Sequence, residues 1–600
     1  MSSLLENALG FIGAIFGLGL SIFVHELGHF LAARNRGLKV LRFSIGMGPK
    51  LYTWHRGGVE YCISALPLGG YVALPQLADM GRLEGGKEGE EEENEKLPPI
   101  SFLDKVIVSA MGAIFNFIFA FLLALIIWGT GEPSTKELMS TRVGYVYESL
   151  NIEGEIVPGP AWEAGIRAGD TILEIDGARV SSYIDIQEKI LTGIGQDEKG
   201  NPETTILVER DGEKHTYNVH AAIDVINNTS KETMRRIGIE PGEEIIVHSV
   251  SKDSPAEEAG LKSGDIIRSV NGNELLSLQT FFDATSDKAN LPARLVVERD
   301  GKELELAINP KTVALTKPLV TVKLERNGLD AAFVVRPDFS EGSGADKTNP
   351  ASHSSLFIHN ILNDEAKVLE RLRPEDRIVA INGKAIESLQ DVESAFNAGR
   401  GPVLELTIGR NGGTQTLPIV FSKIMTEQTP PVTQPMVGFR IARETIITHV
   451  NPFDQFGQQI DRTVRTLKAL LSRKSNIGLG HLSGPIGIVR QLSFVSGIDY
   501  RLGISFLILL NVNLGILNLL PIPILDGGHI LFALIGKIRR KALPIRLVAS
   551  IQGAFMILLL SLMVYVIFKD GVRWFGDNQA ANQSELREKL YIEPVFISEE

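Results

Sequence analysis

The sequence is poor in cysteine and has no excess of basic residues, and each absence excludes a class of protein. Cys62 is the single cysteine among 600 residues, so the chain can form no internal disulfide and no metal site built from several cysteines. Acidic residues outnumber basic ones, 72 to 60, and this balance gives no support for nucleic acid as a partner. Hydrophobic residues make up 44% of the chain, which excludes a disordered protein and is high for a wholly soluble one.

Long hydrophobic runs are present, and they predict four transmembrane helices. Each run reaches the roughly 20 residues that a helix needs to cross a bilayer. The first run is not read as a cleaved signal peptide, because its start is not basic, it is too long and no small-residue cleavage site follows. The four runs are residues 9–33, 106–128, 502–525 and 547–568.

Lysine and arginine in two short loops predict the orientation of these helices. Basic residues are dense in segments 34–56 and 537–546. Because basic loops stay in the cytoplasm, both termini and the region between the second and third spans are predicted to be extracytoplasmic. The acidic insertion at 84–97 falls in a predicted cytoplasmic loop, but acidic residues weigh little in this rule.

The region 141–453 is soluble in composition and repeats one pattern. A small residue and Pro-Ala predict a short helix, Gly-Asp a turn into a strand, and Asp-Gly or Asn-Gly a hairpin turn. A third copy is more degenerate and lacks the glycine before its aspartate. The copies are Gly159-Pro160-Ala161, Gly169-Asp170 and Asp176-Gly177, then Ser254-Pro255-Ala256, Gly264-Asp265 and Asn271-Gly272, then Glu375-Asp376 and Asn382-Gly383.

This repeat resembles bacterial PDZ domains. The resemblance implies an exposed sheet edge to which an extended peptide or a C-terminus can add as a further strand. Candidate binding loops lie at 143–145 and 237–239. The alternative is that the copies are steric spacers that hold no peptide, and the degenerate third copy fits this alternative better than the first two do.

The first hydrophobic run contains the motif His25-Glu26-Leu27-Gly28-His29. On a helix, His25 and His29 lie one turn apart on the same face, so both imidazoles can bind one tetrahedral zinc. Glu26 lies beside them and suits a general base towards a water on the metal. Ionisable side chains inside a span are costly and usually functional, so a metal site is preferred to a pair of structural histidines.

A catalytic zinc needs a third protein ligand, and the third hydrophobic run offers two candidates. Asp526 ends the run, and His529 follows three residues later. Both are predicted at the cytoplasmic end of the span, the depth predicted for His25 and His29. Pro521 and Pro523 break the helix, and a broken helix at membrane depth is tolerated only beside a cavity or other protein.

The HExxH motif, the late Asn-x-x-Pro-x-Pro-x-Leu-Asp-Gly motif and the PDZ-like repeats together resemble the site-2 protease family, of the RseP type. The resemblance implies an intramembrane zinc metalloprotease of the bacterial inner membrane with one zinc per chain. It implies substrates that are single-span membrane proteins, such as anti-sigma-factor-like regulators already cut outside the membrane, or remnant signal peptides. The implied zinc ligands are His25, His29 and Asp526, the catalytic base is Glu26, and the implied substrate-binding residues are Asn116, Asn513, Asn518, Pro521 and Pro523.

Further segments match this family or depart from it. Residues 46–71 resemble its membrane-dipping β-hairpin, whose edge would hold the substrate as an added strand. Segment 483–486, Ser-Gly-Pro-Ile, matches an element before the third span. The chain departs from the family at Ala113, where proline is usual, in the acidic insertion, and in having a third repeat. None of these departures involves the implied zinc ligands.

The predicted architecture is a polytopic α-helical membrane protein with a β-hairpin and a tandem of extracytoplasmic α+β PDZ-like domains. The repeats are predicted to tether or filter substrates. The amphipathic stretch 453–471 is predicted either to lie on the outer membrane surface or to pack on the last repeat. The predicted segments are 1–36 (first span), 37–101 (hairpin loop and acidic insertion), 102–130 (second span), 141–228, 229–330 and 356–450 (PDZ-like domains), 331–355 (linker), 451–500 (amphipathic segment), 501–538 (third span), 545–569 (fourth span) and 570–600 (tail).

Two other classes of function compete with the protease. A membrane scaffold that displays PDZ domains would have no need of His25, His29 and Asp526 in lipid. A zinc transporter would need polar side chains along a path through the membrane, whereas the second and fourth spans carry almost none. Both alternatives predict that the parent and the Glu26→Gln variant behave alike in a cleavage assay.

Overall fold

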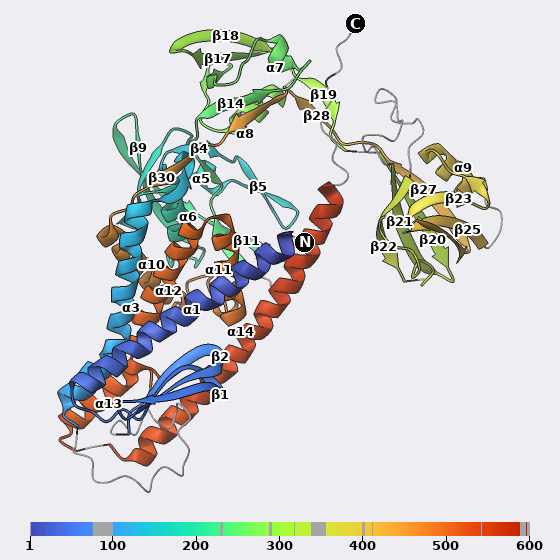
Figure 1. The fold of residues 1–600 in the computed structure, drawn as a ribbon. Helices are drawn as coiled ribbons and strands as arrows, with labels where there is room; N and C mark the ends of the chain where they lie inside the picture. Colours follow the sequence, from blue (N-terminus) through green and yellow to red (C-terminus); the bar gives the residue numbers. More distant parts are fainter. Residues whose placement is uncertain are drawn as a thin grey trace. The chain divides into compact units, whose positions relative to one another are not determined.

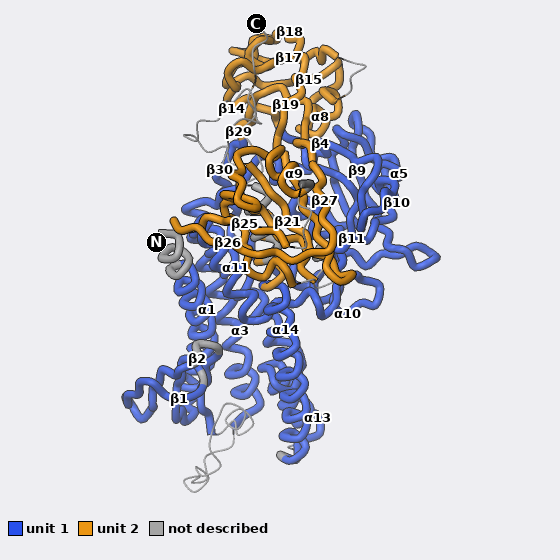
Figure 2. The backbone as a smooth tube through the Cα atoms, turned by 90° about the vertical axis from the view of Figure 1, so that its right-hand side faces the viewer, with its two compact units in different colours: residues 1–243, 443–574 blue, residues 244–442, 575–600 orange. Residues whose placement is uncertain are grey.

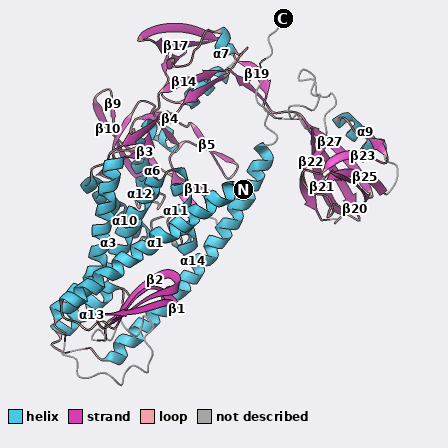
Figure 3. Cartoon of the chain, in the orientation of Figure 1, coloured by secondary structure: helices cyan, strands magenta, loops and turns pink. Residues whose placement is uncertain are grey.

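A computed structural model describes residues 2–75, 100–227, 232–286, 291–316, 318–337, 356–365, 367–398, 403–410, 412–541, 543–588 and 596. The acidic insertion at 84–97 and most of the predicted linker, 338–355, lie outside the described residues. The chain divides into two compact units, residues 1–243 with 443–574 and residues 244–442 with 575–600, as coloured in Figure 2. Helices dominate part of the first unit and strands the second (Figure 3).

Four helices among the described residues are long and apolar enough to cross a membrane, as the hydrophobic runs predicted. They are drawn in Figure 1 as α1 (Ser2–Asn35), α3 (Phe102–Thr130), α12 (Tyr500–Leu519) and α14 (Ile545–Glu588). Helix α14 continues well past 569, so the first part of the predicted tail at 570–600 is helical.

Helix α3 packs against both α1 and α12. Small side chains allow this close approach. Gly28 of α1 lies so near α3 that a Cβ there would stand 2.9 Å from the Met111 carbonyl carbon. Towards α12, Ala120 and Ala124 are fully buried beside Ile508 and Val512. These contacts set the three helices in one bundle through backbone proximity, as is common for helices in lipid.

The predicted third span, 501–538, consists of two helices, with the break at the prolines that the sequence predicted. Helix α12 ends at Leu519, residues 520–525 are non-helical, and α13 (Asp526–Ile538) starts afresh. Pro521 and Pro523 lie in the interruption, where proline removes a backbone donor and clashes with a continuing helix. Asp526 therefore begins a helix, and the prediction that it ends one is wrong.

Strands β1 (Arg42–Arg56) and β2 (Val59–Ala73) form an antiparallel hairpin over the predicted segment. They turn at Gly57 and Gly58, whose positive φ angles of 59° and 78° favour glycine. Segment 42–45 pairs with 60–63 on one side and with 70–73 on the other, so 70–73 is an outer strand of this small sheet. Phe30 of α1 packs edge-to-face on Phe43, which fixes the sheet beside the first span.

The first repeat is a small α+β domain in unit one. Its four-stranded sheet has the order β10-β9-β7-β8, and β13 (Ile239–Pro241) pairs separately with β4 (Val143–Val146). This pairing crosses the predicted boundary at 228/229. The remaining elements are β5 (Ser149–Ile152), β6 (Glu155–Pro158), α5 (Pro160–Ala164), β7 (Thr171–Ile175), β8 (Ala178–Arg179), α6 (Tyr183–Leu191), β9 (Glu203–Arg210), β10 (Glu213–His220), β11 (Ala222–Asn227) and β12 (Glu232–Arg236).

The second repeat is completed by residues from far along the chain. Its sheet has the path β18-β17-β15-β14-β29, in which β29 (Phe439–Ala442) pairs with β14 (Ile245–Val250). The predicted domain end at 330 therefore omits one of its strands. The other elements are α7 (Pro255–Glu258), β15 (Ile266–Val270), β16 (Asn273–Glu274), α8 (Leu278–Ser286), β17 (Ala293–Arg299) and β18 (Lys302–Ile308).

The third repeat is inserted into the second. Strands β19 (Lys311–Ala314) and β28 (Thr433–Met436) pair with each other and bring the chain out and back. Residues 331–337, assigned to a linker by the sequence analysis, belong instead to strand β21. The sheet has the path β26-β25-β23-β22-β21-β20-β27. Its elements are β20 (Leu319–Arg326), β21 (Leu329–Pro337), β22 (Leu356–Asp364), β23 (Arg377–Ile381), β24 (Lys384–Ala385), α9 (Leu389–Ala398), β25 (Val403–Arg410), β26 (Gly413–Val420) and β27 (Lys423–Thr429).

The aspartate of the repeated Gly-Asp or Glu-Asp turn forms the same ion pair in all three copies. Each carboxylate is almost fully buried and accepts two hydrogen bonds from an arginine that ends a later strand. The sequence analysis missed these arginines, although Glu-Arg-Asp-Gly at 209–212 and 298–301 was a readable signal. The pairs are Asp170 with Arg210, Asp265 with Arg299, and Asp376 with Arg410.

The amphipathic stretch forms helix α10 (Pro452–Leu471), which packs on α3 and α12. Phe456 contacts the ring of Phe117 edge-to-face, and Arg462 forms an ion pair with Glu188 of the first repeat. The helix thus joins two spanning helices to the first repeat. The remaining elements are β3 (Glu132–Thr135), α4 (Lys136–Met139), β30 (Thr445–Thr448), a short 3-10 turn (Leu479–His481) and α11 (Pro485–Ile498).

Candidate metal centre

Three side chains from two distant parts of the chain meet inside the helix bundle. His25 Nε2 and His29 Nε2 lie 3.2 Å apart on α1. Asp526 Oδ2, at the start of α13, lies 3.3 Å from the first nitrogen and 3.4 Å from the second. All three residues are buried, and they form a group suited to a metal among the described residues; His529 is not part of it. The geometry therefore favours Asp526 over His529 as the third ligand.

The triangle of ligand atoms fits a tetrahedral zinc. At metal–ligand distances of about 2.0–2.1 Å, two ligands of a tetrahedral ion lie about 3.3–3.4 Å apart. The three separations of 3.2, 3.3 and 3.4 Å agree with this value. Two imidazole nitrogens and a carboxylate oxygen would otherwise direct lone pairs at one another in a buried site, which is unfavourable without a cation. The donor set and its spacing therefore fit zinc.

The other ring nitrogen of each histidine has a partner on α3. His29 Nδ1 lies 2.8 Å from the Val108 carbonyl oxygen, to which it can donate, and this leaves Nε2 free to bind a metal. His25 Nδ1 lies 3.1 Å from the side-chain amide of Asn116. The Asn116 atom at this distance is Nδ2, so metal binding through His25 Nε2 requires the amide to be turned over, with Oδ1 accepting the proton of Nδ1. Asn116, predicted to bind substrate, is thus placed to orient a ligand.

Gly112 is the point at which α3 approaches both imidazoles. A Cβ at this position would lie 2.7 Å from Cε1 of His25 and 2.7 Å from Cε1 of His29, and still nearer to His29 Nε2. Any larger residue would therefore displace the ligands. Gly112 is not among the predicted site residues, because nothing in the local sequence reveals which atoms face a glycine.

Asp526 is positioned by the interruption of the third span. Gly527 and Gly528 follow it, and a Cβ on either would collide with the interrupted backbone. The hypothetical distances are 2.6 Å from Gly527 to the Leu519 carbonyl carbon and 2.7 Å from Gly528 to Pro523 Cα. The two glycines let α13 begin directly against the end of α12, and this close approach turns the Asp526 carboxylate towards α1.

Glu26 is buried beside the ligands and faces the β-hairpin. A Cβ at Gly70 would lie 2.8 Å from Glu26 Cγ and 2.9 Å from the Ser44 carbonyl oxygen. Gly70 belongs to the outer strand 70–73 of the small sheet. The carboxylate predicted as the base therefore lies against the strand predicted to hold substrate.

The predicted asparagines occupy different places. Asn518 Nδ2 lies 3.4 Å from His25 Nε2, so its amide is at the ligand triangle. Asn513 instead accepts a hydrogen bond from Thr463 of α10 and is not brought to the ligands by any described contact. Asn511, which is not among the predicted site residues, donates to Ser21 of α1 at 2.9 Å and ties α12 to the first span.

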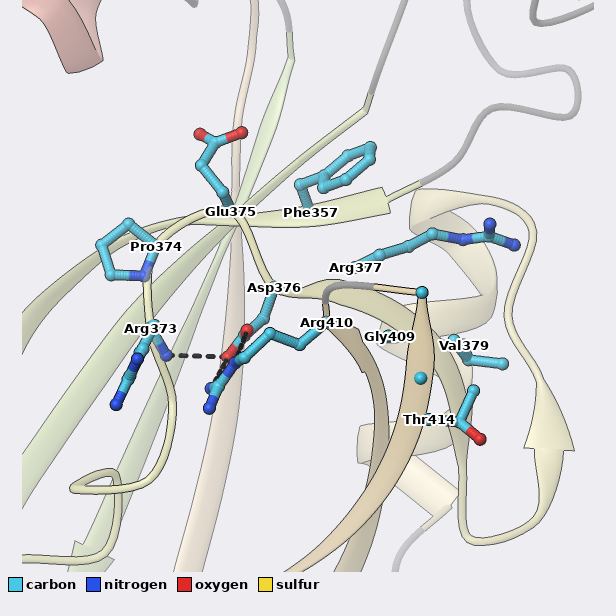
Figure 4. A pocket seen from close by; sticks show the side chains of 12 residues that line it. Phe357, Arg373, Pro374, Glu375, Asp376, Arg377, Val379, Gly409, Arg410 and Thr414 are labelled. Atoms are coloured by element: carbon cyan, nitrogen blue, oxygen red, sulfur yellow. Dashed lines mark hydrogen bonds and ion pairs between the residues drawn. The ribbon is translucent and has the colours of Figure 1, made fainter.

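A separate pocket of about 590 Å³ lies in the third repeat, between residues 357 and 414. Figure 4 shows Asp376 within it, already bonded to Arg410 and to the backbone of Arg373. The pocket contains none of the ligand residues. Its buried carboxylate, Asp376, is engaged in the ion pair shared by all three repeats.

Comparison with known proteins places the chain in a family. A family model described as "Peptidase family M50" matches residues 13–562. The chain belongs to peptidase family M50. It is 27% identical over 579 residues to a protein of Escherichia coli named regulator of sigma-E protease RseP, with 95% of this chain and 99% of that one covered. It is 26% identical over 584 residues to a Vibrio cholerae protein provisionally named a zinc metalloprotease, with 96% and 100% covered.

Family membership and these relatives make the chain a zinc metalloprotease of the site-2 protease type. Its four apolar helices and its RseP-like relatives indicate an inner-membrane protein. A solved PDZ domain protein of Parabacteroides distasonis covers 51% of this chain and all of its own, at 10% identity. Its TM-score is 0.10, so the likeness says nothing about the arrangement of this chain.

Proposed function

We propose that this metalloprotease cuts peptide bonds within the membrane-spanning segments of single-span membrane proteins, either anti-sigma-factor-like regulators or remnant signal peptides. The observation that carries the proposal is that His25 and His29, on a helix apolar enough to cross a bilayer, meet Asp526 at the start of α13. A soluble substrate would gain nothing from a hydrolytic site enclosed by such helices. A hydrolytic site also explains why these costly side chains are kept there.

The residues have distinct roles in the proposed reaction. His25, His29 and Asp526 hold one zinc, which when bound supplies Lewis acidity towards a water and the scissile carbonyl. Glu26 takes a proton from the attacking water and passes it to the leaving amide nitrogen. Asn518 is placed to donate a hydrogen bond to the carbonyl oxygen as negative charge develops on it. Asn116 and Val108 keep the two imidazoles in the orientation that binding requires.

The outer strand 70–73 is proposed to hold the substrate. A helix must be unwound before its peptide bonds can be attacked, because its backbone groups are bonded internally. An extended segment added to strand 70–73 would exchange those bonds for bonds to the strand. Since Gly70 lies against Glu26, a peptide there would run past the base.

The first two repeats are proposed to accept extended peptides and the third is not. Strand β29 of the second repeat has its described pairing on one side only, with β14. Its counterpart in the third repeat, β21, has strands on both sides, β22 and β20. In the first repeat, Tyr183 donates to the Ile239 carbonyl of β13 at 2.7 Å, and burial raises the pKa of that hydroxyl to about 12. The Tyr183 hydroxyl therefore stays protonated and bonded to the Ile239 carbonyl. A peptide that pairs with this carbonyl would have to displace that hydroxyl.

The proposed cleavage is tested with purified protein and a tagged single-span substrate in lipid. The parent is expected to bind one zinc per chain and cut the substrate. Glu26→Gln is expected to keep zinc and lose cleavage, whereas Asp526→Asn is expected to lose both. Asp454→Asn is the charge-matched control, because it makes the same substitution at an exposed aspartate on α10. Cleavage by Glu26→Gln at the parental rate would refute the protease and favour a scaffold or a transporter.

The proposed filter is tested by replacing residues 244–442 with a short Gly-Ser linker, which removes the second and third repeats together. The shortened protein is expected to cut substrates that still carry their extracytoplasmic domain, which the parent leaves intact. Full-length substrate that remains uncut by a shortened, active enzyme would count against a filtering role.

A further inference from the structure

Phe596 is buried although it lies outside any helix or strand. It comes eight residues after the end of α14 and only 7% of its surface is exposed. It belongs to the same compact unit as the second and third repeats. A large aromatic side chain is buried to this degree only where a surface receives it.

The receiving surface is the turn that opens edge strand β29. A Cβ on Gly438, whose φ is 83°, would lie 2.8 Å from Phe596 Cε2 and 2.8 Å from Ser254 Oγ. The ring therefore rests against the backbone of Gly438 and beside the residue that caps α7. Gly438 precedes Phe439, the first residue of the edge proposed above to accept a peptide.

The first repeat has the same turn and covers it with its own chain. Gly238 has a φ of 78°, and its carbonyl accepts a hydrogen bond from Tyr147 at 3.0 Å, as that of Gly438 does from Ser251 at 2.8 Å. A Cβ on Gly238 would lie 3.2 Å from Leu150 Cδ2. Leu150 is 3% exposed and comes from hairpin β5–β6.

The second repeat has no such hairpin. Strand β14 ends at Val250 and α7 begins at Pro255, so no local residue can take the place of Leu150. Phe596 fills that place from the far end of the chain. The first repeat thus covers this turn with a local leucine, and the second repeat covers it with Phe596, which comes after α14 in the sequence.

We propose that Phe596 is an intramolecular ligand of the second repeat, held at the Gly438 turn. Phe596 comes eight residues after α14, a helix long and apolar enough to cross a membrane, so the ligand and the repeat that it occupies belong to distant parts of the sequence. The contact is distinct from the proposed catalysis and is tested without measuring activity.

The first test is photo-crosslinking of the full-length protein with benzoylphenylalanine in place of Phe596. Crosslinks to Ser254 or to segment 437–438 are expected after irradiation and peptide mapping. The same probe at Phe575, which is 65% exposed, is the control and is expected to give none of them. A mixture of isotopically light and heavy protein shows whether the crosslinked residue 596 belongs to the same chain or to a second copy. Light–heavy crosslinks would mean that a second copy supplies Phe596, and crosslinks only to other segments would mean that the site is wrong; either result overturns the proposal.

The second test is hydrogen exchange of the amides in 251–256 and 437–442. Phe596→Ala is expected to speed their exchange about tenfold, because local opening follows the loss of buried contacts. Phe596→Leu is expected to retain most of the protection, since a leucine, Leu150, covers the equivalent turn in the first repeat. Phe575→Ala is the control. Unchanged exchange in the third repeat reports that the fold is kept. Parental exchange in Phe596→Ala would overturn the proposal.

Discussion

Replacing Gly112 with alanine adds one methyl group where α3 meets the metal ligands. The new Cβ would lie 2.7 Å from Cε1 of each imidazole, about 0.7 Å inside the 3.4 Å at which ordinary contact begins. The overlap with His29 Nε2 is larger. Helix α3 cannot retreat from α1 easily, because it is also packed against α12, where Ala120 and Ala124 are fully buried. The imidazoles must therefore move by close to 1 Å.

A displacement of about 1 Å in a catalytic constellation can cost about 100-fold in rate. We expect Gly112→Ala to lower kcat by at least that factor and to weaken zinc binding by about 10- to 100-fold, as loss of a ligand's support does. Zinc content is measured by elemental mass spectrometry, and cleavage is followed with the tagged single-span substrate.

Gly129→Ala in the same helix is the matched control. It makes the same substitution where no atom lies within 4 Å of the new Cβ. Alanine is also the better helix former by about 1 kcal/mol, so neither variant weakens α3 itself. If Gly112→Ala kept both its zinc and its activity while folding normally, the placement of α3 against the ligands would be wrong.

Three further outcomes follow from the same contacts. Asn116→Ala removes the partner of His25 Nδ1 and should weaken zinc binding about 10- to 100-fold in a chelator titration; unchanged affinity would exclude an orienting role. Gly70→Ala crowds Glu26 and should lower kcat about tenfold with zinc content unchanged, so a loss of zinc would contradict the reasoning. Burial raises the pKa of Asp265, but hydrogen bonds from Arg299 and the Lys262 backbone outweigh burial and lower it. The stability this carboxylate adds is therefore present above about pH 4 and is lost as the pH falls further, and hydrogen exchange in the second repeat should show an acid-dependent opening that Asp265→Asn lacks.

The sequence predicted the ligands because their chemistry is local or unusual. HExxH places two imidazoles by helix periodicity alone, and an aspartate at the end of an apolar run needs a partner. The proline-induced break of the third span was also readable, but not that a new helix begins at Asp526. Residues 46–71 were predicted as a hairpin from a resemblance, whereas the structure extends it to 42–73 and pairs 42–45 on both sides, which was not predicted.

Contacts that depend on distant segments were beyond sequence reasoning. Strand β29 completes the second repeat from about 190 residues beyond β14, and no pattern within β29 names its partner. The ion pair of Asp265 with Arg299 was missed because each residue is ordinary by itself. Asn116 was assigned to substrate by resemblance, and only its distance to His25 Nδ1 points to a different role.

The central claim is that His25, His29 and Asp526 bind one zinc ion within the membrane domain. X-ray absorption spectroscopy of the purified full-length protein with one equivalent of zinc tests it most directly. The account predicts two imidazole nitrogens and oxygen ligands at about 2.0–2.1 Å in the parent. In Asp526→Ala, one oxygen ligand and most of the bound zinc should be lost. A zinc site unaffected by that substitution, or one with a single imidazole, would contradict the account.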